Sequence, residues 1–148
     1  MSVAPAATID ALNGLLEAEL NSIFRFMGEG SPYLSRATAE IRKPLVAMVA
    51  AGNRRSMELA EMIDQLGGLP LPGSVQPEEQ YLAFLTLKFL LPKLADAKHL
   101  MIQHYENALR ALKNSPPDVV ALLSAHLSEH RADLLVLQRA AADLLAKK

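Results

Sequence analysis

Apolar residues recur along most of this 148-residue chain with the three- and four-residue spacing of amphipathic helices. In the first segment, from about Thr8 to Met27, the apolar positions are Ile9, Leu12, Leu16, Leu20, Ile23 and Met27. Gly28, Gly30 and Pro32 end the pattern. The spacing predicts one helix here, with a single face turned towards a core.

A second helix is predicted from about Ser35 to Leu66. Its apolar face consists of Leu45, Met48, Val49, Leu59, Met62, Ile63 and Leu66. Pro44 should kink or restart this helix, because proline cannot supply the backbone N–H of a helix interior. Gly67 and Gly68 should end it, as glycines at the C-terminus of a helix do.

Two further helices are predicted in the second half of the chain. The third runs from Pro77 to about Lys113, with a break at Pro92. The fourth runs to about Ala146, with Ser115 as its N-cap and Pro116 as its first helical residue. The first–second and third–fourth connections are short, whereas the second–third connection, around residues 69–76, is the longest. One long crossover in a four-helix bundle is the ferritin-like arrangement, so we expect an all-α, antiparallel four-helix bundle in one domain over residues 1–148.

Composition agrees with this fold and excludes several functions. Hydrophobic residues make up 51% of the chain and aromatic residues only 5%, which disfavours a β-sheet protein. The net charge of −1 provides no basic excess for nucleic-acid binding. The absence of cysteine excludes disulfides and thiolate metal sites.

Two further features indicate a cytoplasmic protein with no membrane partner. The first ten residues, MSVAPAATID, lack the basic and apolar regions of a secretory signal. The longest apolar stretch, from Tyr81 to Leu94, is interrupted by Lys88, Pro92 and Lys93 and is too short to span a bilayer.

Each predicted helix places an ionisable or polar residue on or beside its apolar face. These residues are Glu19 in the first helix, Arg55 in the second, Lys98 in the third and His130 in the fourth. Glu17 falls on the polar face of its helix. His126 lies one turn before His130 and somewhat off the apolar face, while Glu129 and Asp133 lie farther towards solvent.

Each of these residues also has an ordinary structural explanation. A glutamate on an apolar face can be solvated at an edge, and a lysine can extend its ammonium group to water. A core histidine is more often a hydrogen-bonded structural residue than a metal ligand. The four residues together, one near the middle of each helix, favour a shared polar site.

Three stretches resemble the ferritin-like superfamily, in particular its bacterioferritin- and rubrerythrin-like bundles. LNGLLEAELNSIFRF resembles the first helix of that family, with its ligand glutamate in a Leu-rich run. RRSMELAEMIDQLGGLP resembles the end of the second helix and the Gly-Leu-Pro turn. SAHLSEHRADLLVLQ resembles the fourth helix, with a histidine ahead of a Leu repeat.

The resemblance implies a dimetal site with a Glu from each of two helices and a Glu-x-x-His from each of the other two. Matched to this sequence, the first Glu is Glu19. The second-helix pair falls on Gly52 and Arg55, or, with a one-residue shift, on Asn53 and Ser56. The third-helix Glu falls near Lys98, and the fourth-helix pair falls on Leu127 and His130. Two of the six ligands, Glu19 and His130, are therefore retained.

Three functions remain open at this point. The first is a metal-free ferritin-like binding or structural module with no cofactor and no enzymatic activity. The second is an iron- or zinc-binding protein or oxidoreductase whose displaced site uses Glu19, His126 and His130, aided by Asp133, Glu129 or His104. The third is a helical partner-binding protein without ferritin-like ancestry.

For the metal-free form we expect Glu19, Arg55, Lys98 and His130 to approach one another in the core, with Lys98 as the partner of Glu19. Buried charges must be paired and hydrogen-bonded, and cations can replace the charge of the lost metals.

We also expect a homodimer through Tyr81, Phe84, Leu85 and Phe89. The segment Tyr81–Leu91 is apolar nearly all round its helix and needs more cover than one bundle face provides. The alternative is a monomer in which residues 32–44 fold over this segment.

Overall fold

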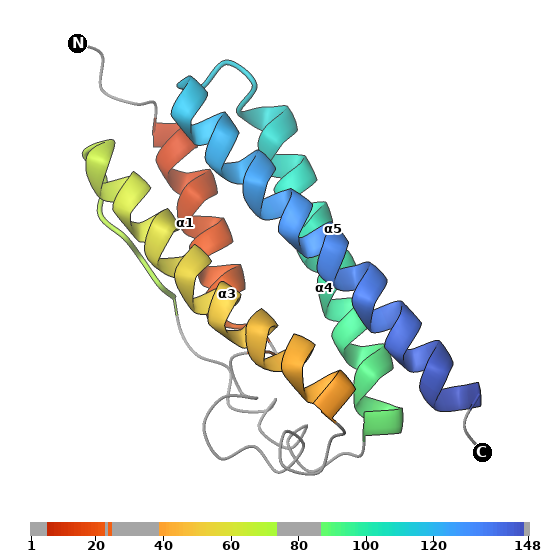
Figure 1. The fold of residues 1–148 in the computed structure, drawn as a ribbon. Helices are drawn as coiled ribbons and strands as arrows, with labels where there is room; N and C mark the ends of the chain where they lie inside the picture. Colours follow the sequence, from red (N-terminus) through yellow and green to blue (C-terminus); the bar gives the residue numbers. More distant parts are fainter. Residues whose placement is uncertain (1–5, 23, 25–38, 74–86, 147–148) are drawn as a thin grey trace.

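Four helices make up the regular structure of the described chain in this computed structural model (Figure 1). They are α1 (Ala6–Leu20), α3 (Ala39–Gln65), α4 (Leu87–Ala111) and α5 (Pro117–Ala146). The structure describes residues 6–22, 24, 39–73 and 87–146. Within these ranges there is no strand, so the predicted all-α bundle is confirmed.

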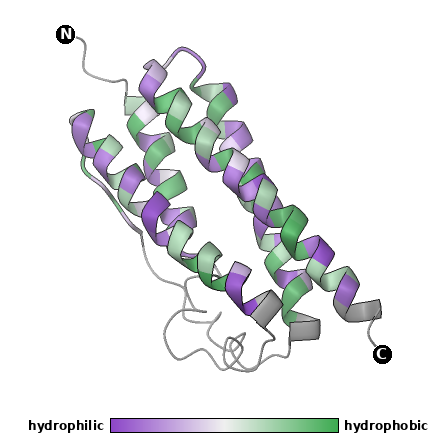
Figure 2. Ribbon diagram, in the orientation of Figure 1, coloured by the Kyte–Doolittle hydropathy of each residue, from purple (hydrophilic) through white to green (hydrophobic). Residues whose placement is uncertain are grey.

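Helix α1 packs mainly against α3, and α4 packs mainly against α5. The early part of α3 shares a core cluster with the early part of α4, and their late parts share the other cluster, so these two helices run in the same direction. Helices α1 and α5 run in the opposite direction (Figure 1). Hydrophilic and hydrophobic residues alternate along every helix (Figure 2), as expected where one face is buried.

The buried apolar residues form two clusters, one towards each end of the bundle. The larger cluster contains Leu12, Leu15, Leu16, Leu59, Ile63, Met101, Tyr105, Ala108, Leu112, Val119, Leu123 and Leu127. The smaller cluster contains Phe24, Leu45, Met48, Leu90, Leu91, Leu94 and Leu137. Along the chain, each of the four predicted polar residues lies between members of these two clusters. A polar layer therefore separates two apolar parts of the core.

The first helix ends at Leu20, so the prediction that it continues to Met27 was wrong. Asn21 donates its side-chain amide to the carbonyl of Glu17 at 3.0 Å, and the Ser22 hydroxyl accepts the backbone N–H of Phe24 at 3.3 Å. Such local side-chain bonds compete with the helical ladder. The predicted residues 25–27 lie outside the described part of the chain.

Helix α3 ends at the predicted glycines. Gly67 has a φ of 86°, and its N–H bonds the carbonyl of Asp64, while the N–H of Gly68 bonds the carbonyl of Ile63 at 2.9 Å. This pair of bonds is a Schellman motif, which requires a left-handed residue at the first position after the helix. Pro44 and Pro92 lie inside continuous helices α3 and α4. Of the kink or restart predicted at Pro44, the restart does not occur, and the break predicted at Pro92 was wrong.

The chain then turns back along α1. Asn13 donates to the carbonyl of Leu69 at 3.2 Å, and its side-chain oxygen accepts the N–H of Leu71 at 2.6 Å. Gly73 lies against the side chain of Glu17, one turn farther along α1. The described start of the connection thus runs lengthwise along the bundle (Figure 1), as the predicted crossover requires.

Helix α5 begins one residue later than predicted. The carbonyl of Pro116 accepts the N–H of Val120 at 3.3 Å, which makes Pro116 the N-cap and Pro117 the first helical residue. The Ser115 hydroxyl, which we had predicted to cap the helix, instead contacts the Thr8 hydroxyl at 3.0 Å. This hydrogen bond joins the start of α1 to the α4–α5 connection.

No helix among the described residues has the length and apolar character needed to cross a membrane. Of the predicted dimer residues, Tyr81, Phe84 and Leu85 lie outside the described residues, as does the side chain of Phe89.

Candidate functional site

Four buried ionisable side chains, one from each helix, occupy the layer between the two apolar clusters. They are the predicted residues Glu19, Arg55, Lys98 and His130, whose exposed fractions are 4%, 1%, 2% and 1%. Each is on the inner face of its helix because it follows the helical period of the neighbouring core leucines. The structure thus brings all four side chains into one hydrogen-bonded cluster.

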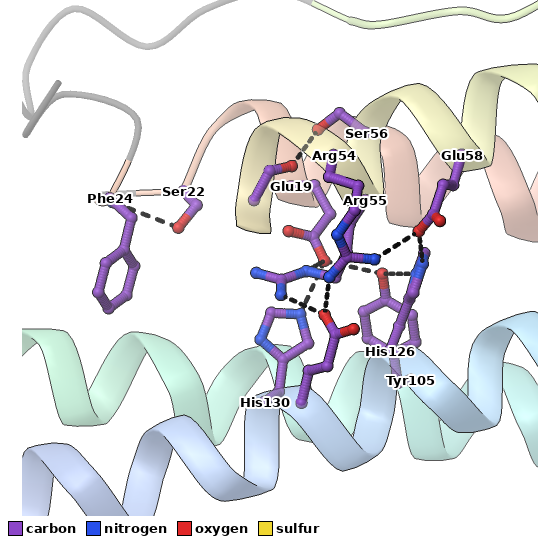
Figure 3. Close-up of polar contacts among 12 residues, drawn as sticks. Glu19, Ser22, Phe24, Arg54, Arg55, Ser56, Glu58, Tyr105, His126 and His130 are labelled. Carbon is purple, nitrogen blue, oxygen red and sulfur yellow. Dashed lines mark hydrogen bonds and ion pairs between the residues drawn. The ribbon is translucent and has the colours of Figure 1, made fainter. Parts of the chain in front are cut away.

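The carboxylate of Glu19 is at the centre of this cluster (Figure 3). Its Oε2 atom accepts hydrogen bonds from Arg55 Nε at 3.0 Å, from the Tyr105 hydroxyl at 2.7 Å and from His130 Nε2 at 2.7 Å. Three donors on one oxygen compensate for removing this charge from water.

Lys98 contacts Glu19 only through His130. Its ammonium nitrogen lies 3.0 Å from His130 Nδ1 and 2.9 Å from Asp133, and 4.6 Å above the ring of Phe24. An ammonium group can only donate, so His130 Nδ1 accepts and the Nε2–H donates to Glu19. The expectation that Lys98 pairs directly with Glu19 was wrong, because the imidazole lies between them.

Arg55 connects the buried layer to a group of charges at the edge of the bundle. Its Nη1 atom lies 2.9 Å from Glu129, which also binds Arg54 at 2.6 Å. Arg54 in turn binds Glu58 at 2.9 Å. Every charge in this group therefore has an oppositely charged neighbour.

Tyr105 and His126 extend the network on the other side of Glu19. The Tyr105 hydroxyl lies 3.1 Å from His126 Nδ1, and His126 Nε2 lies 2.9 Å from Glu58. A continuous series of polar contacts, each of 3.1 Å or less, therefore crosses the core from the partly exposed Glu58 to the partly exposed Asp133. Its members, in order, are Glu58, His126, Tyr105, Glu19, His130, Lys98 and Asp133.

These contacts set the charge states of the buried groups. Burial alone would raise the pKa of Glu19, but the His130 hydrogen bond and the Arg55 charge outweigh it and lower this pKa from 4.5 to about 2. Burial lowers the pKa values of Lys98, His126 and His130. Burial, together with the Glu19 charge, raises the pKa of Tyr105. The network therefore holds an ionised Glu19 among donors.

Sequence reasoning missed several partners in this network. His126 was placed off the apolar face but is only 1% exposed, and Tyr105, which is fully buried, was not recognised as a hydrogen-bonding partner. Glu129 and Asp133 lie towards solvent as predicted, yet they bind the buried cations. Glu129 follows His126 by three residues, and Asp133 follows His130 by three. Residues with this spacing share a helix face, so the sequence could have indicated that these carboxylates lie near the buried site. His104, a candidate helper, is exposed.

The donor set at this site does not fit a metal pair. Within the part of the chain that the structure describes, no group of three or more His, Asp or Glu side chains is arranged to hold an ion. Glu19 Oε2 already accepts three donors, and His130 has both ring nitrogens engaged. A second ligand carboxylate is not available at Gly52, and Arg55 and Lys98 bring positive charge to the same layer.

Comparison with solved structures identifies the fold. The chain is similar to the Desulfovibrio desulfuricans bacterioferritin, which has a diiron site, with a TM-score of 0.80 and 20% identity over 96% of this chain and 82% of that one. It is also similar to a ferritin-like, diiron-carboxylate protein from Bacillus anthracis str. Ames, with a TM-score of 0.71 and 19% identity over 95% and 99% of the two chains. The predicted ferritin-like fold is thus confirmed.

No protein-family model and no curated protein sequence matches the chain. At these levels of identity, the structural likeness establishes the fold and leaves the function to the site itself.

Proposed function

We propose that this chain is a cytoplasmic ferritin-like bundle in which a network of protein charges replaces the dimetal centre, and that it acts as a metal-free binding or structural module. The observation that carries the proposal is the triple hydrogen bonding of Glu19 Oε2 by Arg55, Tyr105 and His130.

Charge supports this proposal. A carboxylate that binds a metal needs a lone pair directed at the ion. Oε2 is surrounded by three donors, and the other oxygen, Oε1, belongs to a cavity that Arg55 also lines, where a cation would be repelled. The guanidinium of Arg55 supplies the positive charge that a buried Glu19 requires. A dication placed beside Arg55 and Lys98 would have to overcome two buried positive charges.

The network can also play a structural role by fixing how the helices align with one another. Buried polar groups can specify the register of packed helices, because any sliding leaves them unpaired among apolar side chains. Here Glu19 can meet Arg55 and His130 in only one mutual register of α1, α3 and α5.

The alternative is an iron- or zinc-binding protein, with Glu19, His126 and His130 as ligands. The diiron sites named for the similar structures favour it. Against it, the Nε2 atoms of the two histidines face carboxylates, and the Nδ1 atom of His130 faces Lys98.

Elemental analysis of the protein purified without chelators distinguishes the two functions. We expect iron and zinc well below one equivalent per chain, and no ferroxidation when Fe(II) is added in air. One or two equivalents that disappear in His130→Ala, with the variant still folded by circular dichroism, would establish the metal-binding alternative.

We further propose a homodimer formed through the apolar segment that contains Tyr81, Phe84, Leu85 and Phe89. Its support is the sequence pattern, together with the burial of the adjoining Leu90 and Leu91 in the chain's own core. These two leucines face the chain's own core from one side of α4. The apolar residues just before them fall on other sides of the helix by sequence, and these sides need a partner to bury them.

A further inference from the structure

A small cavity lies beside Glu19, between α1 and α3. Glu19, Ser22 and Phe24 line it from one side, and Gly52 and Arg55 line it from the other. Its volume is about 10 Å³, which is close to the room that a single water molecule needs. The cavity can therefore hold one molecule no larger than water.

Two buried polar atoms at this cavity have no hydrogen-bond partner among the described residues. The first is Glu19 Oε1, because all three donors bind Oε2. The second is Arg55 Nη2, because Arg55 bonds its neighbours through Nε and Nη1. In Figure 3 neither atom carries a dashed line, and both point to the side where Ser22 and Phe24 lie.

The chemistry of these two atoms restricts what can occupy the cavity. A cation would lie against the guanidinium of Arg55, and an anion would lie against the carboxylate of Glu19. A neutral molecule that both accepts and donates a hydrogen bond satisfies both atoms, and leaving them unpaired would be costly.

We propose that the cavity is a specific binding site for one water-sized hydroxylic molecule, water in the purified protein, which accepts from Arg55 Nη2 and donates to Glu19 Oε1. This inference rests on the contacts of Glu19 and Arg55 and not on the proposed function.

Gly52 makes room for this molecule. The resemblance to ferritin-like proteins places a ligand glutamate at this position, and here the side chain is missing. A Cβ atom added at Gly52 would meet only Arg55 Nη2 within 4 Å, at 3.7 Å. A methyl group therefore fits, and it would lie in contact with the same nitrogen that the proposed molecule binds.

A high-resolution crystal structure of the protein tests the site directly. We expect an electron-density peak at hydrogen-bond distance, roughly 2.7–3.2 Å, from both atoms, and no such peak in Gly52→Ala. A cavity without density overturns the inference. A peak at roughly 2.0–2.2 Å from Glu19 with anomalous signal is a metal, and it would overturn the metal-free function as well.

Thermal unfolding provides a second test with a control in the same chain. Gly14, in α1, has nothing within 4 Å of an added Cβ, so Gly14→Ala should raise the melting temperature by roughly 2–4 °C through helix propensity. Gly52→Ala should raise the melting temperature by less, or lower it, because its methyl group displaces the bridging molecule. Gly52→Ser should recover part of the difference, since its hydroxyl can bond the two atoms. Equal gains in the two alanine variants would contradict the inference.

Discussion

Arg55 and Arg54 are consecutive residues in very different environments. The Arg55 side chain is 2% exposed and binds buried Glu19, whereas that of Arg54 is 46% exposed and binds two partly exposed carboxylates. Removing one partner of a buried ion pair leaves an uncompensated charge, so Arg55→Met should reduce the free energy of unfolding by about 3–5 kcal/mol. Urea denaturation measures this change.

Arg54→Met is the matched control, because it removes the same charge from the next position of the helix. Surface ion pairs contribute little, so the expected loss is below about 1 kcal/mol. Similar losses in the two variants would mean that the Arg55–Glu19 pair makes no special contribution to stability.

The low pKa of Glu19 predicts a pH dependence of stability. Its pKa is about 2 in the folded protein, well below the 4.5 of an unperturbed glutamate. A lowered carboxyl pKa stabilises the fold above pH 4.5, and this stabilisation, about 3 kcal/mol, is lost as the pH falls towards 2. The lowered pKa values of His126 and His130 also make the fold less stable as the pH falls below 6.5.

Unfolding free energies measured between pH 2 and 7 check this prediction. The difference between the wild type and Glu19→Gln should shrink as the pH falls from 5 to 2, since the wild type then loses its own carboxylate. Glu61→Gln, at an exposed position of α3, is the control. A constant difference across this range would show that the Glu19 charge does not stabilise the fold.

Helical periodicity was sufficient to identify the residues that point inwards, but it could not give their partners. It selected Glu19, Arg55, Lys98 and His130 because only the angle around each helix was needed. It predicted a direct ion pair between Lys98 and Glu19, whereas His130 lies between them and contacts both. Pairing depends on side-chain length and on the rotation of neighbouring helices, and neither follows from the pattern of one helix.

At the level of the elements, the end of α3 depends on one backbone conformation. Gly67 adopts a φ of 86°, where a Cβ atom costs roughly 1–2 kcal/mol. Gly67→Ala should therefore lower the free energy of unfolding by about 1 kcal/mol. Gly67→Asn should lose less, because asparagine tolerates this conformation. A Cβ atom added at Gly67 would meet nothing within 4 Å, so equal losses measured by urea denaturation would indicate that the left-handed conformation is not the cause.

Helix ends were predicted well where the backbone dictates them and poorly where side chains do. The glycines after α3 were identified because a left-handed residue is needed there. The ends near Leu20 and Ser115 were misplaced. At Leu20 the Asn21 and Ser22 side chains bond local backbone, and at Ser115 the hydroxyl bonds Thr8 from a distant helix. Such choices depend on contacts that the local sequence does not contain.

At the scale of the whole molecule, the fold was predictable because four periodic segments and one long connection leave few alternatives. The oligomeric state is the remaining prediction at this scale. Light scattering at micromolar concentration should give twice the chain mass of 16.1 kDa. The double variant Phe84→Glu/Leu85→Glu, still folded by circular dichroism, should give the mass of one chain. A wild-type mass of one chain that stays constant on concentration would exclude the dimer.

The polar layer also divides the molecule into two parts that need not open together. Among the described residues, all four helices contribute to the larger apolar cluster. In the smaller cluster, α1 has already ended, and Phe24, which follows it, contributes in its place. Local unfolding begins where fewer apolar contacts hold the backbone. We expect the amide hydrogens of Leu45–Val49 to exchange with solvent faster than those of Leu59–Ile63 under native conditions. The two ends of α3 would then belong to different cooperative units, joined by the layer of charges between them.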